Sequence, residues 1–283
     1  MALSEDFLAS TVLISFQTGP DTGSCGTGFL VFREIEKENS RGHCYLVTNR
    51  HVLPKEGKET SVSLRVTLGD GGSAQLTQVA IPVVGGDGRY TPAVRGHTNP
   101  DFDIAVVNVT PQVVELGIRA CWLPYDLFVS KEKLRGENIT VGDRIFLLGY
   151  PDAIYDPRNV WPILRQGVIA TVPSEGYSFN ERLRKKYGLP AWIDGFLIDA
   201  TVFPGSSGSL VILEPQAATV GPGGRTVIGR AKSTPYLLGI VSGSIPIRDE
   251  DLGAVQRMGL GVVYSAEAIR ETIEQFYKTS PAV

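Results

Sequence analysis

About a dozen short runs of β-branched and aromatic residues recur along this chain, and glycine, proline or aspartate separates each run from the next. Such residues pack well on a pleated sheet, and the breakers between them form turns. Few stretches have the spacing of an amphipathic helix. The pattern therefore predicts an all-β fold. The expected strands are Thr11–Gln17, Gly28–Arg33, Tyr45–Thr48, Ser61–Leu68, Thr77–Val84, Ile104–Val109, Arg144–Leu148, Gly167–Val172, Gly195–Ala200, Ser209–Leu213, Tyr236–Ser242 and Gly261–Tyr264.

These strands are enough for two six-stranded antiparallel β-barrels. We expect an N-terminal barrel over about residues 11–115 and a C-terminal barrel over about residues 140–264, within a single domain that spans residues 1–283. Two helices are expected outside the barrels. Residues 3–9 are expected to form a short helix with Ser4 as its N-cap. Residues 266–278 carry an apolar stripe between charged positions, as a helix on the surface of a domain does.

Three segments have the composition of insertions. Residues 152–161 and 215–235 are rich in turn formers, and the second reads as a long loop between two strands. Residues 178–190 contain the densest basic cluster, Arg182–Lys186, and predict a short helix with a solvated face. The loop at 215–235 is long enough to reshape or cover a nearby pocket.

Charge, cysteine content and hydropathy exclude several classes of protein. The net charge of −3 argues against a sequence-independent nucleic-acid binder, which concentrates Lys and Arg. No apolar run approaches the roughly 18 residues of a membrane span, and the N-terminus has no secretory signal pattern. Three cysteines and three histidines occur at no metal-like spacing. We therefore expect a cytoplasmic protein with reduced thiols, no metal and no cofactor, and no nucleic-acid or membrane partner.

A Pro-Gly-Ser turn at residues 204–209 runs directly into an apolar strand and presents the hydroxyl of Ser207. Glycine on either side permits positive φ angles and close approach of a ligand. The amides of Gly205 and Ser207 can then point into one small space, as donors to a developing oxyanion do. An isolated turn of this composition is also ordinary structural material.

Two upstream residues have side chains suited to activate that hydroxyl. His51 follows the apolar strand at Tyr45–Thr48, and imidazole is a natural general base near neutral pH. Asp103 opens the strand at Ile104–Val109, where a buried carboxylate needs a partner such as an imidazole N–H. Each alone also fits a structural role. Asp101 is the second candidate for the acid, with its side chain expected on the other side of the turn.

In the order His, Asp, Ser, at strand edges of an all-β chain, these residues resemble the triad of the trypsin-like (chymotrypsin-fold) serine peptidases. The resemblance extends from about Thr11 to the final helix and includes the segments Gly26–Val31 and Leu238–Ser244. It is closer to the intracellular high-temperature-requirement proteases than to digestive enzymes, although no PDZ-sized segment follows. Ser206 replaces the aspartate that pairs with a new N-terminus in digestive enzymes, so activation by N-terminal cleavage is not expected.

The resemblance implies a catalytic triad of His51, Asp103 and Ser207, with the amides of Gly205 and Ser207 as oxyanion hole. It also implies a primary specificity pocket that has Thr201 at its base. Ser242, Gly243 and Ser244 would form the wall of this pocket. Since no acid is available there, a preference for a small or medium uncharged residue is expected rather than for Arg or Lys.

The resemblance makes a serine endopeptidase with a protein or peptide substrate the leading functional hypothesis. A catalytically silent peptide-binding module on a protease fold and a serine esterase remain alternatives. An α/β-hydrolase is not expected, because that fold orders its triad Ser, Asp, His and carries its serine between a strand and a helix. We also expect activity to be regulated by a protein partner, by loop ordering or by oligomerisation, since an unguarded cytoplasmic peptidase would be harmful.

Overall fold

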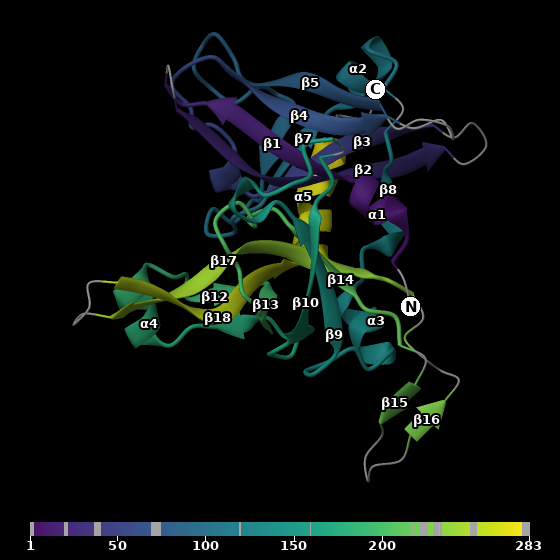
Figure 1. Ribbon diagram of the computed structural model, residues 1–283, viewed down its shortest axis with the longest axis vertical. Coiled ribbons are helices and arrows are strands. Elements are labelled where there is room, and N and C mark those ends of the chain that lie inside the picture. The colour runs from purple at the N-terminus through teal and green to yellow at the C-terminus, as the bar shows by residue number, and fades with distance from the viewer. Residues whose placement is uncertain are drawn as a thin grey trace.

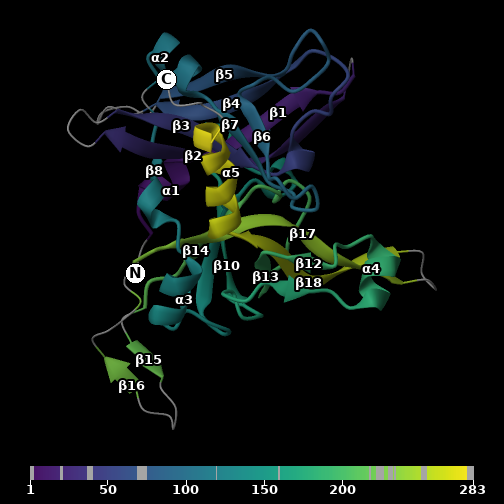
Figure 2. The same ribbon diagram turned by 180° about the vertical axis from the view of Figure 1, so that it is seen from behind.

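The computed structural model describes residues 3–19, 22–36, 41–68, 75–118, 120–158, 160–216, 218–220, 226–228, 232, 234–249 and 254–278. In Figures 1 and 2 the N-terminal sheet forms the upper half of the molecule and a β-barrel forms the lower half. The helix α5, Ala266–Lys278, rises from the barrel and runs along the upper sheet. It contacts β6 and β7 of the sheet and β17 and β18 of the barrel, so it ties the two halves together.

The N-terminal half is one curled sheet, and eight strands of the described chain belong to it. Their order is β5-β4-β1-β2-β3-β7-β6, and β8 pairs in parallel with β2 while the other pairs are antiparallel. The strands are β1 (Thr11–Gln17), β2 (Gly23–Glu36), β3 (Arg41–Thr48), β4 (Thr60–Leu68), β5 (Gln75–Val84), β6 (Val94–Gly96), β7 (Ala105–Asn108) and β8 (Leu123–Pro124).

The C-terminal half is a closed six-stranded barrel in the order β10-β13-β18-β17-β14-β9. Its strands are β9 (Arg144–Gly149), β10 (Ile163–Ile169), β13 (Gly195–Asp199), β14 (Leu210–Leu213), β17 (Leu237–Asp249) and β18 (Ala254–Ser265). Two small hairpins lie outside it, namely β11 (Tyr177–Ser178) with β12 (Trp192–Ile193), and β15 (Ala218–Val220) with β16 (Thr226–Ile228).

Apolar side chains fill each half separately. One buried cluster centres on Ile14, Leu46 and Val107 of the N-terminal sheet. A larger one fills the barrel and continues into the contact between the halves, where Phe29 and Tyr45 join it. Burial of this surface is the main favourable contribution to folding, and it holds the turns at the strand ends in place.

The predicted all-β fold with a closed C-terminal barrel and a C-terminal helix is confirmed. The helix at residues 266–278 has the expected bounds, and α1 (Glu5–Ala9) begins after Ser4, whose hydroxyl accepts from the Asp6 amide. In detail, the N-terminal sheet is a curled half-barrel that contains two strands that were not predicted, β6 and β8, and β17 and β18 extend well beyond the predicted strands. Cross-strand pairing lengthens this hairpin, and pairing partners are not visible in a local pattern.

Three further helices lie at the surface: α2 (Thr110–Glu115), α3 (Lys131–Gly136) and α4 (Glu181–Tyr187). The predicted helix within residues 178–190 is α4. Asn180 caps it, and Arg182, Arg184 and Lys185 are exposed to solvent, as expected for a solvated face. None of the described helices is long and apolar enough to cross a membrane.

The described residues of the insertion at 215–235 lie at the far end of the barrel from the predicted pocket. The strand β14 runs away from the Ser207 turn, and its last residue, Leu213, pairs with Ile145 at the opposite end of β9. The hairpin β15–β16 leaves the barrel at that far end, at the bottom of Figures 1 and 2. Strand direction therefore sends the described part of this loop away from the pocket. Residues 217, 221–225, 229–231 and 233 of this segment lie outside the described residues.

Candidate functional site

His51 and Asp103 come from the N-terminal sheet and contact each other. His51 lies in a short 3₁₀ turn, Arg50–Val52, that follows β3, and Asp103 lies two residues before β7. Since β3 and β7 are neighbours in the sheet, their ends bring the two side chains together. The imidazole Nδ1 lies 2.5 Å from Asp103 Oδ2, and the His51 amide donates to Asp103 Oδ1 at 3.1 Å.

This double contact sets the orientation of the imidazole. With Nδ1–H donating to the carboxylate, Nε2 carries the lone pair of the neutral ring. The His51 side chain is 52% exposed and Asp103 is 24% exposed, so the ring faces solvent while the acid is partly sheltered. Nε2 makes no hydrogen bond to any residue that the structure describes, and it is therefore open to a proton donor.

Ser207 and Ser242 come from the barrel and complete a chain of contacts. The Ser242 hydroxyl donates to Asp103 Oδ2 at 2.8 Å, so this carboxylate oxygen accepts from both His51 and Ser242. The Ser207 hydroxyl donates to the Ser242 carbonyl at 2.8 Å. The Ser207 hydroxyl is therefore bonded to Ser242 rather than to His51. A rotation about the Cα–Cβ bond of Ser207 would redirect this hydroxyl.

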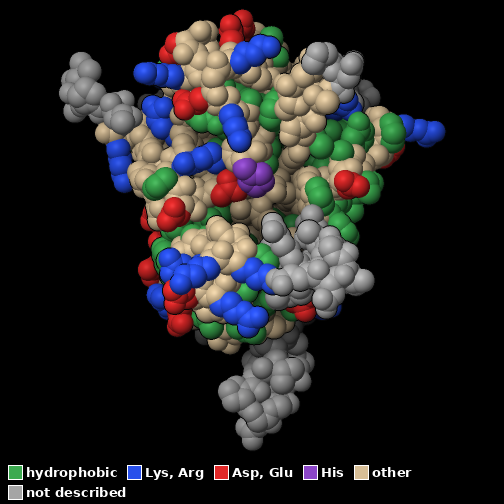
Figure 3. Space-filling model, turned by 90° about the vertical axis from the view of Figure 1, so that its left-hand side faces the viewer, with side chains coloured by type: hydrophobic (Ala, Val, Ile, Leu, Met, Phe, Trp, Pro, Cys, Tyr) green, Lys and Arg blue, Asp and Glu red, His purple; other side chains and the backbone are tan. Residues whose placement is uncertain are grey.

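The two halves meet on one face of the molecule. Figure 3 shows this face, the left-hand side of Figure 1, with a histidine side chain at the surface beside a hollow between the halves. Among the three histidines, His51 is exposed, whereas His43 is half-buried and His97 is buried. The hollow leaves room for an extended chain to approach.

The turn that carries Ser207 holds two free backbone donors. Neither the Gly205 amide nor the Ser207 amide donates to a residue within the described ranges, whereas Ser206, Gly208 and Ser209 all donate to backbone carbonyls. The preceding carbonyl, that of Pro204, accepts from the Asp152 amide at 2.6 Å. Because the N–H and C=O of a trans peptide point in opposite directions, the Gly205 N–H points away from Asp152.

Gly205 requires glycine at this position. Its φ is +80°, and an added Cβ would lie 2.4 Å from the Tyr150 carbonyl oxygen. Only glycine adopts this conformation without strain and without displacing the backbone of Tyr150. Glycine at position 205 therefore permits the turn that leaves the amides of Gly205 and Ser207 free.

Thr27 of β2 pins the same turn to the N-terminal sheet. Its amide donates to the Ser207 carbonyl at 2.9 Å, and its hydroxyl donates to the Gly205 carbonyl at 2.8 Å. The hydroxyl also accepts from the Tyr150 amide at 3.0 Å. Thr27 is fully buried, so these bonds are made away from water, where they hold the two halves in register.

The residues expected to form the specificity pocket lie at one level of the barrel. Thr201 is exposed just after β13, and Ser242, Gly243 and Ser244 lie in β17. In register, Ile198 of β13 pairs with Gly261 of β18, and Gly261 pairs with Ser244. An added Cβ at Gly243 would have no heavy atom within 4 Å, so that position faces open space.

Asp101, the second candidate for the acid, does not contact His51. Its amide donates to Asn99 Oδ1, and its carbonyl accepts from the Tyr264 hydroxyl at 3.0 Å. Burial raises the pKa of Tyr264 to about 12, so its phenol stays protonated and remains a donor at neutral pH. Asp101 thus helps to join the loop before Asp103 to the barrel.

Sequence reasoning missed three residues of this arrangement. The sequence predicts Ser242 in the pocket wall alone, and it predicts no role in the site for Thr27 or Asn49. Asn49 is buried, and its side-chain amide donates to the Asp103 carbonyl at 2.6 Å. An asparagine directly after an apolar strand is the one signal in the sequence for such a role.

No metal-binding group of acidic, histidine or cysteine side chains occurs among the described residues. The three cysteines, Cys25, Cys44 and Cys121, are free thiols.

Comparisons with known proteins identify a family and similar folds. Residues 26–221 match the model of the trypsin-like peptidase domain family. Among solved structures, Deg5 has a TM-score of 0.50 at 14% identity, with 96% of this chain and 90% of that chain covered. HL collagenase has a TM-score of 0.50 at 13% identity, with 98% and 96% covered. The active form of the Rv3671c protease from M. tuberculosis has a TM-score of 0.48 at 17% identity, with 98% and 85% covered. No curated protein matches the chain.

Proposed function

This chain belongs to the trypsin-like peptidase family, and from that premise we propose that it is a serine endopeptidase with His51, Asp103 and Ser207 as its catalytic triad. One observation carries the proposal: His51 and Ser242 both contact Asp103 Oδ2, and Ser207 contacts Ser242. The chain of contacts joins a base, an acid and a nucleophile drawn from both halves of the molecule.

In the proposed reaction the Ser207 hydroxyl rotates from the Ser242 carbonyl to His51 Nε2 when a peptide fills the hollow. His51 takes the proton as Oγ attacks the scissile carbonyl, and it later returns that proton to the leaving amine. Asp103 stabilises the imidazolium through the contact at Nδ1. Hydrogen bonds between catalytic residues are often long or poorly aligned before the substrate binds. The contact of Ser207 with Ser242 in place of His51 is therefore compatible with this role.

The free amides of Gly205 and Ser207 are the proposed oxyanion hole. They carry no competing partner among the described residues, and they lie on the turn that presents the nucleophile. Removing one such donor typically lowers kcat by about 10²–10³. Thr27 and Gly205 support this turn, so the donors would be in place before the reaction starts.

We infer an uncharged side chain as the residue preferred on the acyl side of the cleaved bond. Thr201 would lie at the base of its pocket, with Ser242, Gly243 and Ser244 along the wall. None of these four residues carries a charge that could pair with Arg or Lys. The free thiols support the further proposal that the protein works in the reducing cytoplasm. We also propose a protein or peptide substrate and control by a regulatory protein partner.

Labelling with a fluorophosphonate probe tests the function. Wild type and Ser206→Ala are expected to react, whereas Ser207→Ala and His51→Ala are not. Ser206 is the matched control, because it is the adjacent serine, is buried and has an Oγ without a partner in the described structure.

Peptide and ester substrates, assayed in parallel, then separate an endopeptidase from an esterase. Labelling of Ser207→Ala at the wild-type rate would overturn the assignment of the nucleophile. A folded wild-type protein that neither labels nor cleaves peptides, even after addition of cell lysate, would favour the silent binding module instead.

A further inference from the structure

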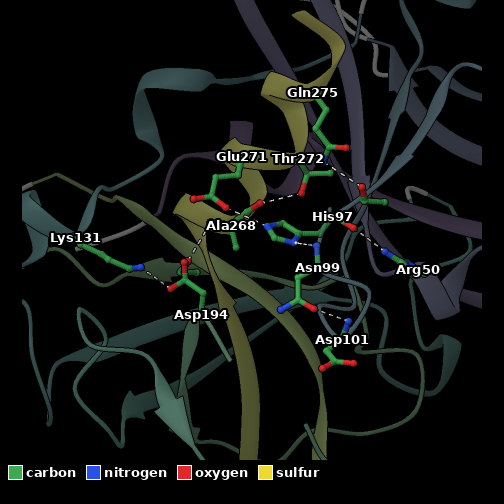
Figure 4. A network of polar contacts seen from close by, with 12 residues as sticks. Arg50, His97, Asn99, Asp101, Lys131, Asp194, Ala268, Glu271, Thr272 and Gln275 are labelled. Atoms are coloured by element: carbon green, nitrogen blue, oxygen red, sulfur yellow. Dashed lines mark hydrogen bonds and ion pairs between the residues drawn. The ribbon is translucent and has the colours of Figure 1, made fainter. Parts of the chain in front are cut away.

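The loop that delivers Asp103 begins at a buried histidine, His97, which has no part in the proposed triad. Its side chain is 5% exposed, and it stacks on Phe102 with 4.7 Å between the ring centroids. Figure 4 shows it at the centre of a polar network that includes α5, the His51 turn and the loop itself.

Both ring nitrogens of His97 have assigned roles. Nδ1 accepts from the Asn99 amide at 3.0 Å, so it carries the lone pair. Nε2 therefore carries the proton, and it donates to Glu271 Oε2 of α5 at 3.1 Å. The side chain of Asn99 in turn accepts from the Asp101 amide at 3.0 Å. One imidazole thus sets the path of the backbone that precedes Asp103.

The backbone of His97 is fixed as well. Its carbonyl accepts from Arg50 Nη2 at 3.1 Å, and its amide donates to the Ile104 carbonyl at 3.2 Å. The neighbouring Gly96 carbonyl accepts from the Gln275 side chain of α5 at 3.1 Å. The loop from His97 to Ile104 is therefore closed at its base, and its base is attached to the C-terminal helix.

Several hydrogen bonds hold the loop between its base and the Asp103 carboxylate. Asn49 and Tyr264 donate to the carbonyls of Asp103 and Asp101. Inside the loop, His97 Nδ1 accepts from the Asn99 amide, and Asn99 Oδ1 accepts from the Asp101 amide. Loss of His97 Nδ1 would leave the half-buried Asn99 amide without this partner, and a donor that loses its partner away from bulk water costs free energy. The backbone would shift to regain a partner, and Asp103 would shift with it.

We propose that His97 is a positioning residue for Asp103, and that through Asn99 and Glu271 it couples the C-terminal helix to the geometry of the His51–Asp103 pair. The proposal rests on the proposed function, since it assigns His97 a role in that same site. A displacement of about 1 Å in a catalytic group can cost about 10²-fold in rate. His97 acts on the reaction only through Asp103 and touches neither His51 nor Ser207.

Four variants separate a positioning role from a merely structural one. His97→Leu removes both contacts, His97→Asn keeps an acceptor near the place of Nδ1, and His97→Gln keeps a donor near the place of Nε2. His43→Leu is the matched control, because His43 Nδ1 also bonds α5, at Tyr277 Oη 2.8 Å away, but it lies on β3 and outside the Asp103 loop.

The rate of fluorophosphonate labelling is the first readout, with folding checked by thermal unfolding. We expect His97→Leu and His97→Gln to label about 10- to 100-fold more slowly than wild type. His97→Asn is expected to recover most of the rate, and His43→Leu to keep it. Equal rates for folded His97→Leu and wild type would overturn the proposal, and so would a His97→Asn variant as slow as His97→Leu.

The second readout does not require activity. The proton between His51 Nδ1 and Asp103 should give a low-field NMR resonance, which we expect to shift or broaden in His97→Leu and to return in His97→Asn. An unchanged resonance in His97→Leu would contradict positioning. A wild type that shows the resonance but never labels would contradict the proposed function, while the His97 series would still test the geometry.

Where His97→Leu does not fold, Glu271→Ala takes its place. The Glu271 side chain is 57% exposed, so its removal should leave the fold intact while it frees His97 Nε2. A labelling rate several-fold below wild type is expected, and an unchanged rate and resonance would overturn the proposal.

Discussion

At the scale of single residues, Ser242 contacts two members of the proposed triad at once. Its hydroxyl donates to Asp103, and its carbonyl accepts from Ser207. Together with the contact from His51, the bond from the Ser242 hydroxyl helps to hold the Asp103 carboxylate in the orientation that the proposed mechanism needs. The same residue lies in β17 next to Gly243, so one strand contacts both the acid and the nucleophile and also carries the expected pocket wall.

Gly243 gives the pocket assignment a direct test. An added side chain there meets no neighbour within 4 Å, so Gly243→Val should fold normally and place two methyl groups in the space expected for the substrate. We expect kcat/KM for peptides to fall by about tenfold or more, since pocket contacts of this size discriminate by that factor. Labelling by a small fluorophosphonate should change far less.

Gly136→Val is the control for this experiment, because Gly136 in α3 also has open space around its Cβ position and lies in the barrel's surface helix. A Gly243→Val enzyme that cleaves peptides as fast as wild type would show that Gly243 does not line the substrate site.

At the scale of elements, strand direction decides which insertions can reach the site. The base of the β15–β16 insertion is fixed at the far end of β9, where the side chains of Lys232 and Gln216 both contact Asp143. Lys232 and Asp143 are buried, and each charge is tolerated in the interior because the other charge is its partner. This ion pair therefore fixes the base of the insertion at the end of the barrel where β14 ends.

Replacing residues 218–228 with Gly-Ser-Gly should therefore leave the labelling rate at Ser207 within about twofold of wild type, since loops distant from a site tolerate replacement. The replacement keeps Gln216 and Lys232, and a thermal unfolding measurement checks that the barrel remains folded. A rate that falls tenfold or more in a stably folded variant would restore a role for this insertion in the site.

Local patterns were sufficient for many elements but not for their ends. Alternating and β-branched runs predicted β1 with its observed bounds, and the apolar stripe predicted α5. The hairpin of β17 and β18 extends past its predicted ends, since its residues pair with each other and not with a sequence neighbour. The short strand β8 depends on β2, which lies far from it in the sequence.

At the scale of the whole molecule, the site exists only while the two halves stay together. Thr27 of the N-terminal sheet bonds the Ser207 turn, and Ser242 of the barrel bonds Asp103. On the far side of this contact, Arg33 of β2 pairs with Glu274 of α5 at 2.9 Å, and its guanidinium lies 3.7 Å from the Tyr277 ring centroid. Separation of the halves would break these contacts and would remove Ser207 from His51 and Asp103.

The cysteines report on this state of assembly. Burial raises the pKa of Cys44 and of Cys121 to about 11, and Asp6 adds to the shift at Cys121. Burial and Asp152 also raise the pKa of Cys25, which is nonetheless exposed. A raised pKa lowers the thiolate fraction below pH 11, and the thiolate is the form that reacts. At pH 8 iodoacetamide should modify Cys25 first and leave Cys44 and Cys121 intact.

In a urea titration at pH 8, modification of Cys44 and loss of Ser207 labelling should occur in the same transition, measured by mass spectrometry of peptides. Labelling that persists after Cys44 has reacted would show that the active geometry survives the exposure of Cys44. Rapid modification of Cys121 without urea would contradict the burial that raises its pKa.

The sequence by itself determined the local structure of this protein and the kinds of side chain placed at its strand ends. Turn residues, strand propensity and the helix stripe act over a few neighbours, so a pattern in the chain is enough to predict them. The same patterns predicted that His51, Asp103 and Ser207 lie at strand ends and that Gly205 is a turn glycine.

Only the tertiary structure decided what these side chains touch. The bond from Ser242 to Asp103 joins residues 139 positions apart, and the bond from Thr27 Oγ1 to the Gly205 carbonyl joins residues 178 positions apart. Such contacts depend on which strands neighbour each other and on how two buried cores meet. No local pattern carries that information, because it arises from the packing of the whole chain.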